Sequence, residues 1–185
     1  RREKPRDRVY GDREIRALWQ AYGDLPALSR DALRCIAVLA QRPNEVMAMH
    51  SADVEGRWWT IPARQAKNGL AHRVYLPDLA HEIIAPRLGE GWVFPSPRGD
   101  GPIETLQKMH ERARKAAGVA GQIRDWRRTG ASRMASDGVP RYIVGRVLNH
   151  VEPGVTAVYD RHSYDAEKQD ALERWESLLR AILTG

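Results

Sequence analysis

Apolar residues recur every three to four positions along most of this chain, which is the spacing of an amphipathic helix. In the first such segment Ile15, Leu18 and Tyr22 share one face, and Asp12 is expected to cap its start. A second segment, behind Ser29 as the expected cap, is apolar nearly all round and should therefore be central. The full pattern predicts helices from Asp12 past Tyr22 and over 30–41, 43–49, 78–87, 103–117, 125–136, 140–148 and 165–183.

Two short segments break this helical pattern. RWWTIP (57–62) and HRVYLP (72–77) are rich in β-branched and aromatic residues, and a proline ends each. Between them lies Asn68-Gly69, a pair typical of tight turns. We therefore expect an antiparallel hairpin with Lys67 at or beside its tip. The Gly- and Pro-rich stretch 91–102 is expected to be a loop, or a short strand and a loop.

Helices with one small inserted sheet predict a mainly α domain with a small antiparallel β-sheet, in the α+β class. A length of 185 residues corresponds to about one domain. Residues 1–10 are polar and are expected to be a linker or the edge of the expressed chain, with the domain spanning 11–185. Within the predicted helices, the apolar faces expected to be buried comprise Leu106, Met109, Ala113 and Ala116, and then Ala171, Leu172, Trp175, Leu178, Leu179 and Ile182.

The composition is that of an ordinary globular protein, with 42% apolar and 29% charged residues. No apolar run approaches the roughly 18 residues that a membrane span needs. The opening RREKPRDRVY also lacks the apolar segment of a secretory signal. The single cysteine, Cys35, lies in an apolar run and is expected to be a buried thiol. The histidines do not pair with cysteine or acidic residues at ligand spacing, so we expect no metal and no cofactor.

Positive charge is concentrated in one part of the chain. Residues 108–133 carry eight basic side chains against Glu111 and Asp125, which accounts for the whole formal net charge of +6. Such a concentration favours a polyanionic partner, although a solvated basic helix face would look the same. The basic residues that we expect to contact DNA, in addition to the candidates for chemistry below, are Lys108, Arg112, Arg128 and Arg133.

Four local features could carry chemistry, and each also has an ordinary structural interpretation. Arg42 precedes the helix that Pro43 starts, where it could hold an anion, and Glu45 could orient its guanidinium. Lys67 could be a catalytic group or a solubilising turn residue. The remaining features are RDWRRTGAS (124–132), with three arginines near a helix start, and VLNHVEPGVTAVYDRHSY (147–164), in which His150 is followed by Tyr159 and Tyr164.

Taken in order, these features resemble the catalytic domain of the tyrosine recombinases, the site-specific integrases of phages and prophages. That family carries an Arg with an acid three residues on, a hairpin Lys, a His-x-x-Arg helix start, a Leu-Gly-His-like segment and a nucleophilic Tyr. The matching positions here are Arg42 with Glu45, Lys67, Arg124 with Arg127, His150 in Leu-Asn-His, and Tyr159. The pieces QRPNEV, WWTIPARQAKNG, WRRTGAS and VTAVYDRHSYDAEK also resemble prophage integrases.

One position departs from the family pattern. Arg124 stands where the family most often has histidine at the start of His-x-x-Arg. Arginine can donate hydrogen bonds to a phosphate oxygen but cannot transfer a proton, so binding could survive while proton movement is altered. Arg124 could instead point away from the site.

The resemblance implies a DNA strand transferase that works without metal or ATP. Arg42, Arg127 and Arg124 would hold the scissile phosphate, and Tyr159 would attack it to form a 3′-phosphotyrosyl ester. Lys67 would protonate the 5′ oxygen, and His150 would either take the tyrosine proton or hydrogen-bond the phosphate. Tyr159 is the better nucleophile because its spacing from His150 matches the family, whereas Tyr164 is expected to pack.

The implied partners are double-stranded DNA attachment sites and further protomers, in a tetramer expected only on DNA. The isolated domain is expected to be a monomer in the cytoplasm, at the bacterial nucleoid, without membrane contact and without the N-terminal core-binding domain of the family. Alternatives are a non-catalytic DNA-binding relative disabled at Arg124, a type IB topoisomerase-like enzyme, and an unrelated basic adaptor. The sequence does not decide whether the last helix docks on its own domain or on a neighbour.

Overall fold

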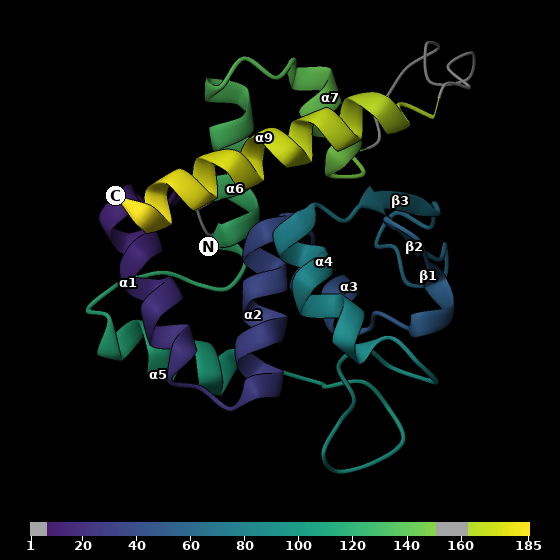
Figure 1. The fold of residues 1–185 in the computed structure, drawn as a ribbon, viewed down its shortest axis with the longest axis horizontal. Helices are drawn as coiled ribbons and strands as arrows, with labels where there is room; N and C mark the ends of the chain where they lie inside the picture. The colour runs from purple at the N-terminus through teal and green to yellow at the C-terminus, as the bar shows by residue number, and fades with distance from the viewer. Residues whose placement is uncertain (1–6, 151–162) are drawn as a thin grey trace, which may run out of the picture.

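The protein, described over residues 7–150 and 163–185 by a computed structural model, arranges its helices around a central helix, α2 (Figure 1). The helices α1, α4, α6 and α9 all contact α2, and the small sheet lies at one side of the molecule (Figure 1). This arrangement confirms the predicted α+β class. The described helices are α1 (Asp12–Gly23), α2 (Ala27–Leu39), α3 (Pro43–Met47), α4 (Asp78–Ile84), α5 (Gln107–Ala116), α6 (Asp125–Ser136), α7 (Arg141–Val147) and α9 (Asp165–Thr184), with short 3₁₀ turns η1 (Ser51–Asp53) and η2 (Ala85–Arg87).

The starts of the first two helices differ from the prediction. Gly11, not Asp12, is the cap of α1, and Asp12 lies in the first turn, where a negative charge favours the helix dipole. The expectation that Ser29 caps α2 is wrong, because α2 already begins at Ala27, after Pro26. Ser29 is instead buried within the first turn of α2. Proline has a fixed φ, which favours a helix start directly after Pro26 over one after Ser29.

Helix α2 is the centre of the core, as its nearly continuous apolar pattern predicts. Leu33, Ile36 and Leu39 are fully buried, and the predicted burial of Cys35 is confirmed. The helix ends where Ala40 adopts a left-handed conformation, with φ of 52°. This conformation disfavours a residue with a Cβ atom, so the packing around Ala40 must hold it there.

The close approach of α6 to α2 depends on a glycine. A Cβ atom on Gly130 would lie 2.7 Å from the Cβ of Ala40, closer than two carbon atoms can pack. Only glycine therefore lets α6 pass α2 at this distance. The approach matters for the site, because α6 and the end of α2 both contribute to it.

The three strands form one antiparallel sheet in the order β1–β2–β3. The predicted hairpin is confirmed: β2 (Trp58–Ile61) pairs with β3 (His72–Tyr75), and Trp59 lies opposite Val74. Strand β1 (Val54–Glu55) was not predicted, because two residues carry no alternating pattern. The connection between β2 and β3 carries Lys67.

Helix α5 buries a different face from the one expected. Leu106 and Ala113 are buried as predicted, but Ala116 is exposed and Met109 is only partly buried. His110 is buried in their place, and its Nδ1 lies 2.9 Å from the Tyr22 hydroxyl of α1. A polar residue with a partner on another helix can displace alanine from a core face, which the helical period alone does not reveal.

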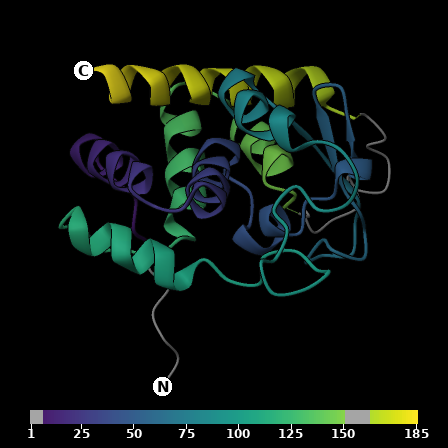
Figure 2. The ribbon, with the colours of Figure 1, turned by 60° about the horizontal axis from the view of Figure 1, so that its bottom comes forward.

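The last helix, α9, packs on its own domain and runs across one face of it from the sheet to α1 (Figures 1 and 2). Leu172, Trp175 and Leu179 are buried, and the Trp175 indole N–H donates to the carbonyl of Ala37 in α2 at 3.1 Å. At its other end, Lys168 donates to the carbonyl of Arg73 in β3 at 3.0 Å. Among the described helices, none is long and apolar enough to span a bilayer.

Candidate functional site: a cationic pocket

The corner that leads from α2 into α3 holds the first predicted arginine. The Nη1 atom of Arg42 donates to Glu45 Oε1 at 2.9 Å, and the backbone N–H of Arg42 donates to Glu45 Oε2 at 3.4 Å. The Glu45 side chain is only 3% exposed, so its carboxylate is fixed by packing as well as by these bonds. Pro43 starts the helix directly after Arg42. The first helical turn then brings Arg42 and Glu45, three positions apart, onto the same side. The guanidinium of Arg42 is therefore oriented by the protein itself.

Arg127, on the first turns of α6, is held even more firmly. Its Nη1 donates to the carbonyl of Ala40 at 3.3 Å and to Gln41 Oε1 at 3.5 Å, and its Nη2 donates to the carbonyl of Leu148. Burial, together with the positive charge of Arg42, lowers the pKa of Arg127 to about 10. Arg127 thus remains charged at neutral pH. A guanidinium has five N–H groups, so at least two of them have no partner among the described residues.

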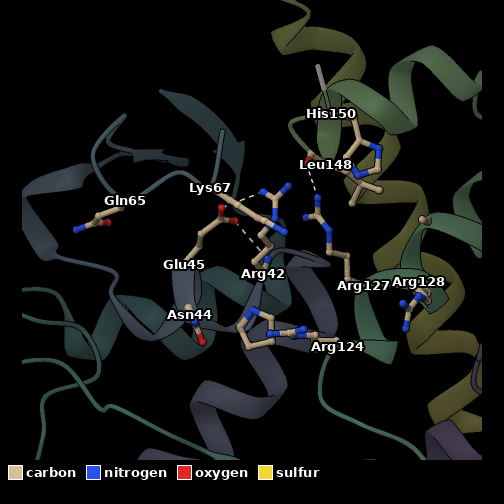
Figure 3. Close-up of a pocket in the computed structure, with 12 residues that line it drawn as sticks. Arg42, Asn44, Glu45, Gln65, Lys67, Arg124, Arg127, Arg128, Leu148 and His150 are labelled. Carbon is tan, nitrogen blue, oxygen red and sulfur yellow. Dashed lines mark hydrogen bonds and ion pairs between the residues drawn. The ribbon is translucent and has the colours of Figure 1, made fainter. Parts of the chain in front are cut away.

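These two arginines line a pocket of about 620 Å³ that gathers most of the predicted site residues (Figure 3). We call Arg42, Glu45 and Arg127 the inner wall. Lys67, Arg124 and His150 lie at its opening and are called the rim. The pocket is lined by Arg42, Pro43, Asn44, Glu45, Gln65, Lys67, Arg124, Arg127, Arg128, Ala131, Leu148 and His150. Five of these residues are cationic and one is acidic, so the pocket suits an anion.

The rim differs from the inner wall in having exposed side chains. Lys67, Arg124 and His150 are all exposed. Within residues 7–150 and 163–185, no hydrogen bond or ion pair engages the Lys67 ammonium or the Arg124 guanidinium. The structure places Arg124 at the N-cap of α6, on the pocket side, so the alternative in which it points away does not hold.

His150 is an unprotonated imidazole at neutral pH. Partial burial lowers its pKa, and the positive charges of Arg127 and Arg42 lower it further. Its backbone N–H donates to the carbonyl of Gly145 at 2.9 Å, which fixes the residue to the end of α7. A neutral imidazole can accept a proton or a hydrogen bond within this cationic pocket.

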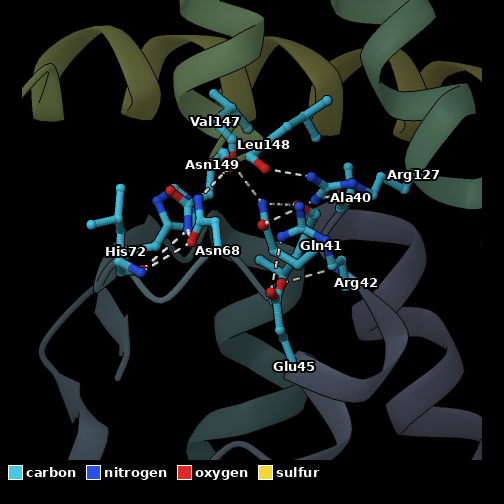
Figure 4. A network of polar contacts seen from close by, with 12 residues as sticks. Ala40, Gln41, Arg42, Glu45, Asn68, His72, Arg127, Val147, Leu148 and Asn149 are labelled. Atoms are coloured by element: carbon cyan, nitrogen blue, oxygen red, sulfur yellow. Dashed lines mark hydrogen bonds and ion pairs between the residues drawn. The ribbon is translucent and has the colours of Figure 1, made fainter. Parts of the chain in front are cut away.

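The end of α7 ties the elements of the site together (Figure 4). We call the carbonyls of Val147, Leu148 and Asn149 the α7 corner. The last carbonyls of a helix have no partner within the helix, and here side chains from other elements donate to them. The donors are Gln41 Nε2 to Val147 at 2.9 Å, His72 Nε2 to Val147 at 2.9 Å, Arg127 to Leu148, and Asn68 Nδ2 to Asn149 at 3.0 Å.

His72 can make this bond over a wide pH range. Burial lowers its pKa to about 4, and the charges of Lys168, Arg127 and Arg42 act in the same direction. The imidazole is therefore neutral above about pH 4 and donates from Nε2 to the Val147 carbonyl. Residue 72 was predicted only as a strand position.

Of the four further basic residues predicted to contact DNA, only Arg128 lines the pocket. Lys108 and Arg112 lie exposed on α5 and do not line the pocket. Arg133 forms an ion pair with Asp12 of α1. Arg128 lines the pocket but is also paired with the buried Asp125 at 2.9 Å. The basic segment 108–133 is thus distributed over several surfaces rather than forming one patch.

Two tyrosines that precede α9 in the sequence, Tyr159 and Tyr164, were weighed as the nucleophile. Tyr159 lies outside the described residues, so its role stays a prediction. Tyr164, just before α9, contacts the ring of Tyr142 with centroids 6.2 Å apart, and the guanidinium of Arg146 lies 4.8 Å from its ring centroid. Tyr164 is not among the pocket-lining residues.

The sequence did not point to the polar residues whose hydrogen bonds hold the pocket-lining segments in place. Gln41 is fully buried directly before Arg42, and a glutamine at the end of an apolar helix could have been noticed. Asn68 was interpreted only as a turn residue, and Asn149 only as part of a motif. In the described part of the chain, no group of three or more His, Cys, Asp or Glu side chains could hold a metal ion.

Comparison with known proteins identifies the fold. The integrase from mycobacterium phage Brujita matches with a TM-score of 0.74 at 18% identity, covering 98% of this chain and 65% of that one. A lambda integrase dimer bound to a COC′ core site matches with a TM-score of 0.66 at 21% identity, covering 89% of this chain and 50% of that one. XerH site-specific recombinase bound to a difH substrate matches with a TM-score of 0.64 at 17% identity, covering 88% of this chain and 53% of that one. At such identities the likeness shows the fold, which is that of the tyrosine recombinase catalytic domain.

This chain spans less than two thirds of the length of each of these structures. No curated protein sequence is similar enough to it to count as a match. The family model described as the phage integrase family, however, matches residues 10–166, which is most of the chain. The resemblance predicted from the motifs is therefore confirmed, and the chain belongs to the phage integrase family of tyrosine recombinases.

Proposed function

We propose that this chain is the catalytic domain of a site-specific DNA recombinase. The observation that carries the proposal is the convergence of Arg42, Lys67, Arg124, Arg127 and His150 on one pocket, although they come from segments up to 108 residues apart. A phosphodiester is an anion whose charge increases during displacement at phosphorus. Preorganised cations around the phosphorus are the type of group that stabilises such a transition state.

In the proposed reaction the inner wall binds the scissile phosphate. The N–H groups of Arg127 that have no partner among the described residues donate to its non-bridging oxygens, as does the guanidinium of Arg42, and Arg124 adds a donor from the rim. These side chains can supply the positive charge that metal ions supply in other phosphoryl-transfer enzymes. Their orientation precedes DNA binding, because Glu45 and the α7 corner already hold the two inner guanidinium groups.

Cleavage then forms a bond between Tyr159 Oη and phosphorus and breaks the bond from phosphorus to the 5′ oxygen. His150, neutral at pH 7, accepts the tyrosine proton, and the Lys67 ammonium gives a proton to the departing 5′ oxygen. The product is a 3′-phosphotyrosyl ester with a free 5′ hydroxyl. Because the ester conserves the energy of the phosphodiester, a second DNA end can displace the tyrosine without ATP.

The proposed partners are double-stranded attachment sites and further copies of the protein. The matched structures of the fold include a lambda integrase dimer on a core site and a lambda integrase tetramer on a Holliday junction. By analogy, we expect four protomers to assemble on two DNA sites. The isolated domain, with α9 packed on its own core, is expected to be a monomer.

The test is trapping of the covalent intermediate on a nicked suicide substrate that carries the matching attachment site. Wild-type protein and Tyr164→Phe should give the protein–DNA adduct, and Tyr159→Phe should give none. The reverse pattern would assign the nucleophile to Tyr164. Salt-sensitive DNA binding without any adduct would instead support the non-catalytic DNA-binding alternative.

A further inference from the structure

The segment that carries Lys67 has one side-chain connection to the end of α7. Residues 62–71 join β2 to β3 as a series of turns, with backbone hydrogen bonds such as Gly69 N–H to the Ala66 carbonyl at 2.9 Å. These bonds are internal to the segment, so they do not fix the segment relative to the pocket. Asn68, the neighbour of Lys67, makes hydrogen bonds that connect the segment to the end of α7.

Asn68 and Asn149 bond reciprocally (Figure 4). Asn68 Nδ2 donates to the Asn149 carbonyl at 3.0 Å, and Asn149 Nδ2 donates to Asn68 Oδ1 at 3.2 Å and to the Leu70 carbonyl at 3.3 Å. Asn68 Oδ1 also accepts from the Leu70 N–H at 3.1 Å. We call this set of bonds the asparagine clasp. It connects the residue after Lys67 to the residue before His150.

The backbone at Asn149 explains why an asparagine suits this position. Its φ is 52°, in the left-handed region that glycine and asparagine adopt most readily. Glycine would satisfy the backbone equally well but would contribute no side-chain donor. Asparagine therefore adds a connection to the Lys67 segment that the backbone conformation itself does not require.

We propose that Asn68 and Asn149 are positioning residues for Lys67, and that the asparagine clasp holds its ammonium at the 5′ side of the scissile phosphate. The ammonium has no partner among the described residues, so its place depends on the backbone that carries it. The inference rests on the proposed function, in which the bond from phosphorus to the 5′ oxygen breaks as Lys67 protonates that oxygen. Misplacing a catalytic group by about 1 Å can reduce a rate about 100-fold.

The test uses a leaving group that needs no proton. In one suicide substrate the bridging 5′ atom is oxygen, and in a matched one it is sulfur, which departs as a thiolate because thiols are far more acidic than alcohols. The variants are Asn149→Gly, Asn68→Ala and the double variant. With the oxygen substrate, we expect each to reduce single-turnover cleavage by about 10- to 100-fold. With the sulfur substrate, cleavage should return to within about threefold of wild type, as it should for Lys67→Ala.

The two asparagines should also be coupled. Because they act through one set of bonds, the double variant should be little slower than either single variant rather than slower by the product of their effects. Leu70→Ala is the matched control, since it changes an exposed side chain of the same segment and leaves the clasp bonds intact. It should cleave the oxygen substrate at the wild-type rate.

Three outcomes would overturn the proposal. Unchanged cleavage of the oxygen substrate would show that the clasp does not matter, and equal loss on both substrates would show general damage rather than misplacement of Lys67. Failure of the wild-type protein to form an adduct with either substrate would overturn the proposed function and the clasp together. Glycine suits the backbone of residue 149, so Asn149→Gly should fold, and Asn68→Ala applies the same test from the other side of the clasp.

Discussion

The inner wall and the rim of the pocket carry the same kind of charge but are built differently. Arg42 and Arg127 are fixed by a buried carboxylate and by backbone carbonyls before any ligand arrives. Lys67 and Arg124 are exposed and lack such partners among the described residues. A cation that is already held loses little freedom on binding, whereas a free one can adapt to its ligand. The wall should therefore determine how well the charge of the transition state is stabilised. At the rim, Lys67 and His150 should move protons, and Arg124 should adjust the grip on DNA.

Removing Arg127 should have the largest effect on DNA cleavage. Arg127→Ala deletes the proposed donors to the phosphate and also leaves the carbonyls of Ala40 and Leu148 without the Arg127 donor. We expect single-turnover cleavage to fall about 1000-fold, and the free energy of unfolding to fall by about 1–3 kcal/mol. Suicide-substrate kinetics and urea denaturation measure the two effects.

Arg127→Lys separates charge from geometry. A single ammonium cannot span acceptors on α2 and at the α7 corner, so we expect the lysine variant to remain at least about 100-fold slow. Recovery of wild-type cleavage by lysine would contradict the comparison, because it would mean that charge alone is sufficient at the inner wall.

A second change tests the inner wall without removing a charge. Gly130→Ala places a Cβ atom 2.7 Å from the Cβ of Ala40, whose carbonyl accepts from Arg127. The two helices must separate, and we expect the free energy of unfolding to fall by about 1–3 kcal/mol in urea denaturation. Gly89→Ala is the control, since nothing lies within 4 Å of its added Cβ atom, and it should be neutral. Equal stability of the two variants would show that the contact between α2 and α6 is not tight.

The smallest effect is expected at Arg124, on the rim. Arg124→Ala removes one exposed cation that holds no described protein group, so the free energy of unfolding should stay within about 0.5 kcal/mol of wild type. DNA affinity should fall about tenfold, and the slope of log affinity against log salt should decrease by about one. Titrations of DNA binding at several salt concentrations measure both. A loss of stability as large as that of Arg127→Ala would place Arg124 with the wall instead.

The sequence predicted those parts of the molecule whose signals are local. The β2–β3 hairpin follows from β-rich segments around Asn68-Gly69, and α9 follows from the apolar face that includes Leu172, Trp175 and Leu179. The family motif identified the side chains that meet in the pocket, although spacing alone could not show that they meet. Tyr159 remains a prediction.

What the sequence could not reveal depends on partners that are far away along the chain. His110 replaces Ala116 in the core because Tyr22, 88 residues earlier, offers a hydrogen bond. The α7 corner is made of backbone carbonyls, which every residue has, so no residue type indicates that Gln41 or His72 will donate to them. Such support becomes visible only when the folded elements are side by side.

The path of α9 has a consequence for how the protein is made. Every side chain of the cationic pocket precedes α9 in the order of synthesis, yet α2 and α6 pack against that helix, and the Trp175 indole reaches the Ala37 carbonyl. A chain emerging from the ribosome thus exposes its arginines and lysines before the scaffold that should space them is closed. Until α9 folds back, α2 and α6 lack a helix that packs against them, so we expect the pocket to take its final shape only after residues 165–184 have been made.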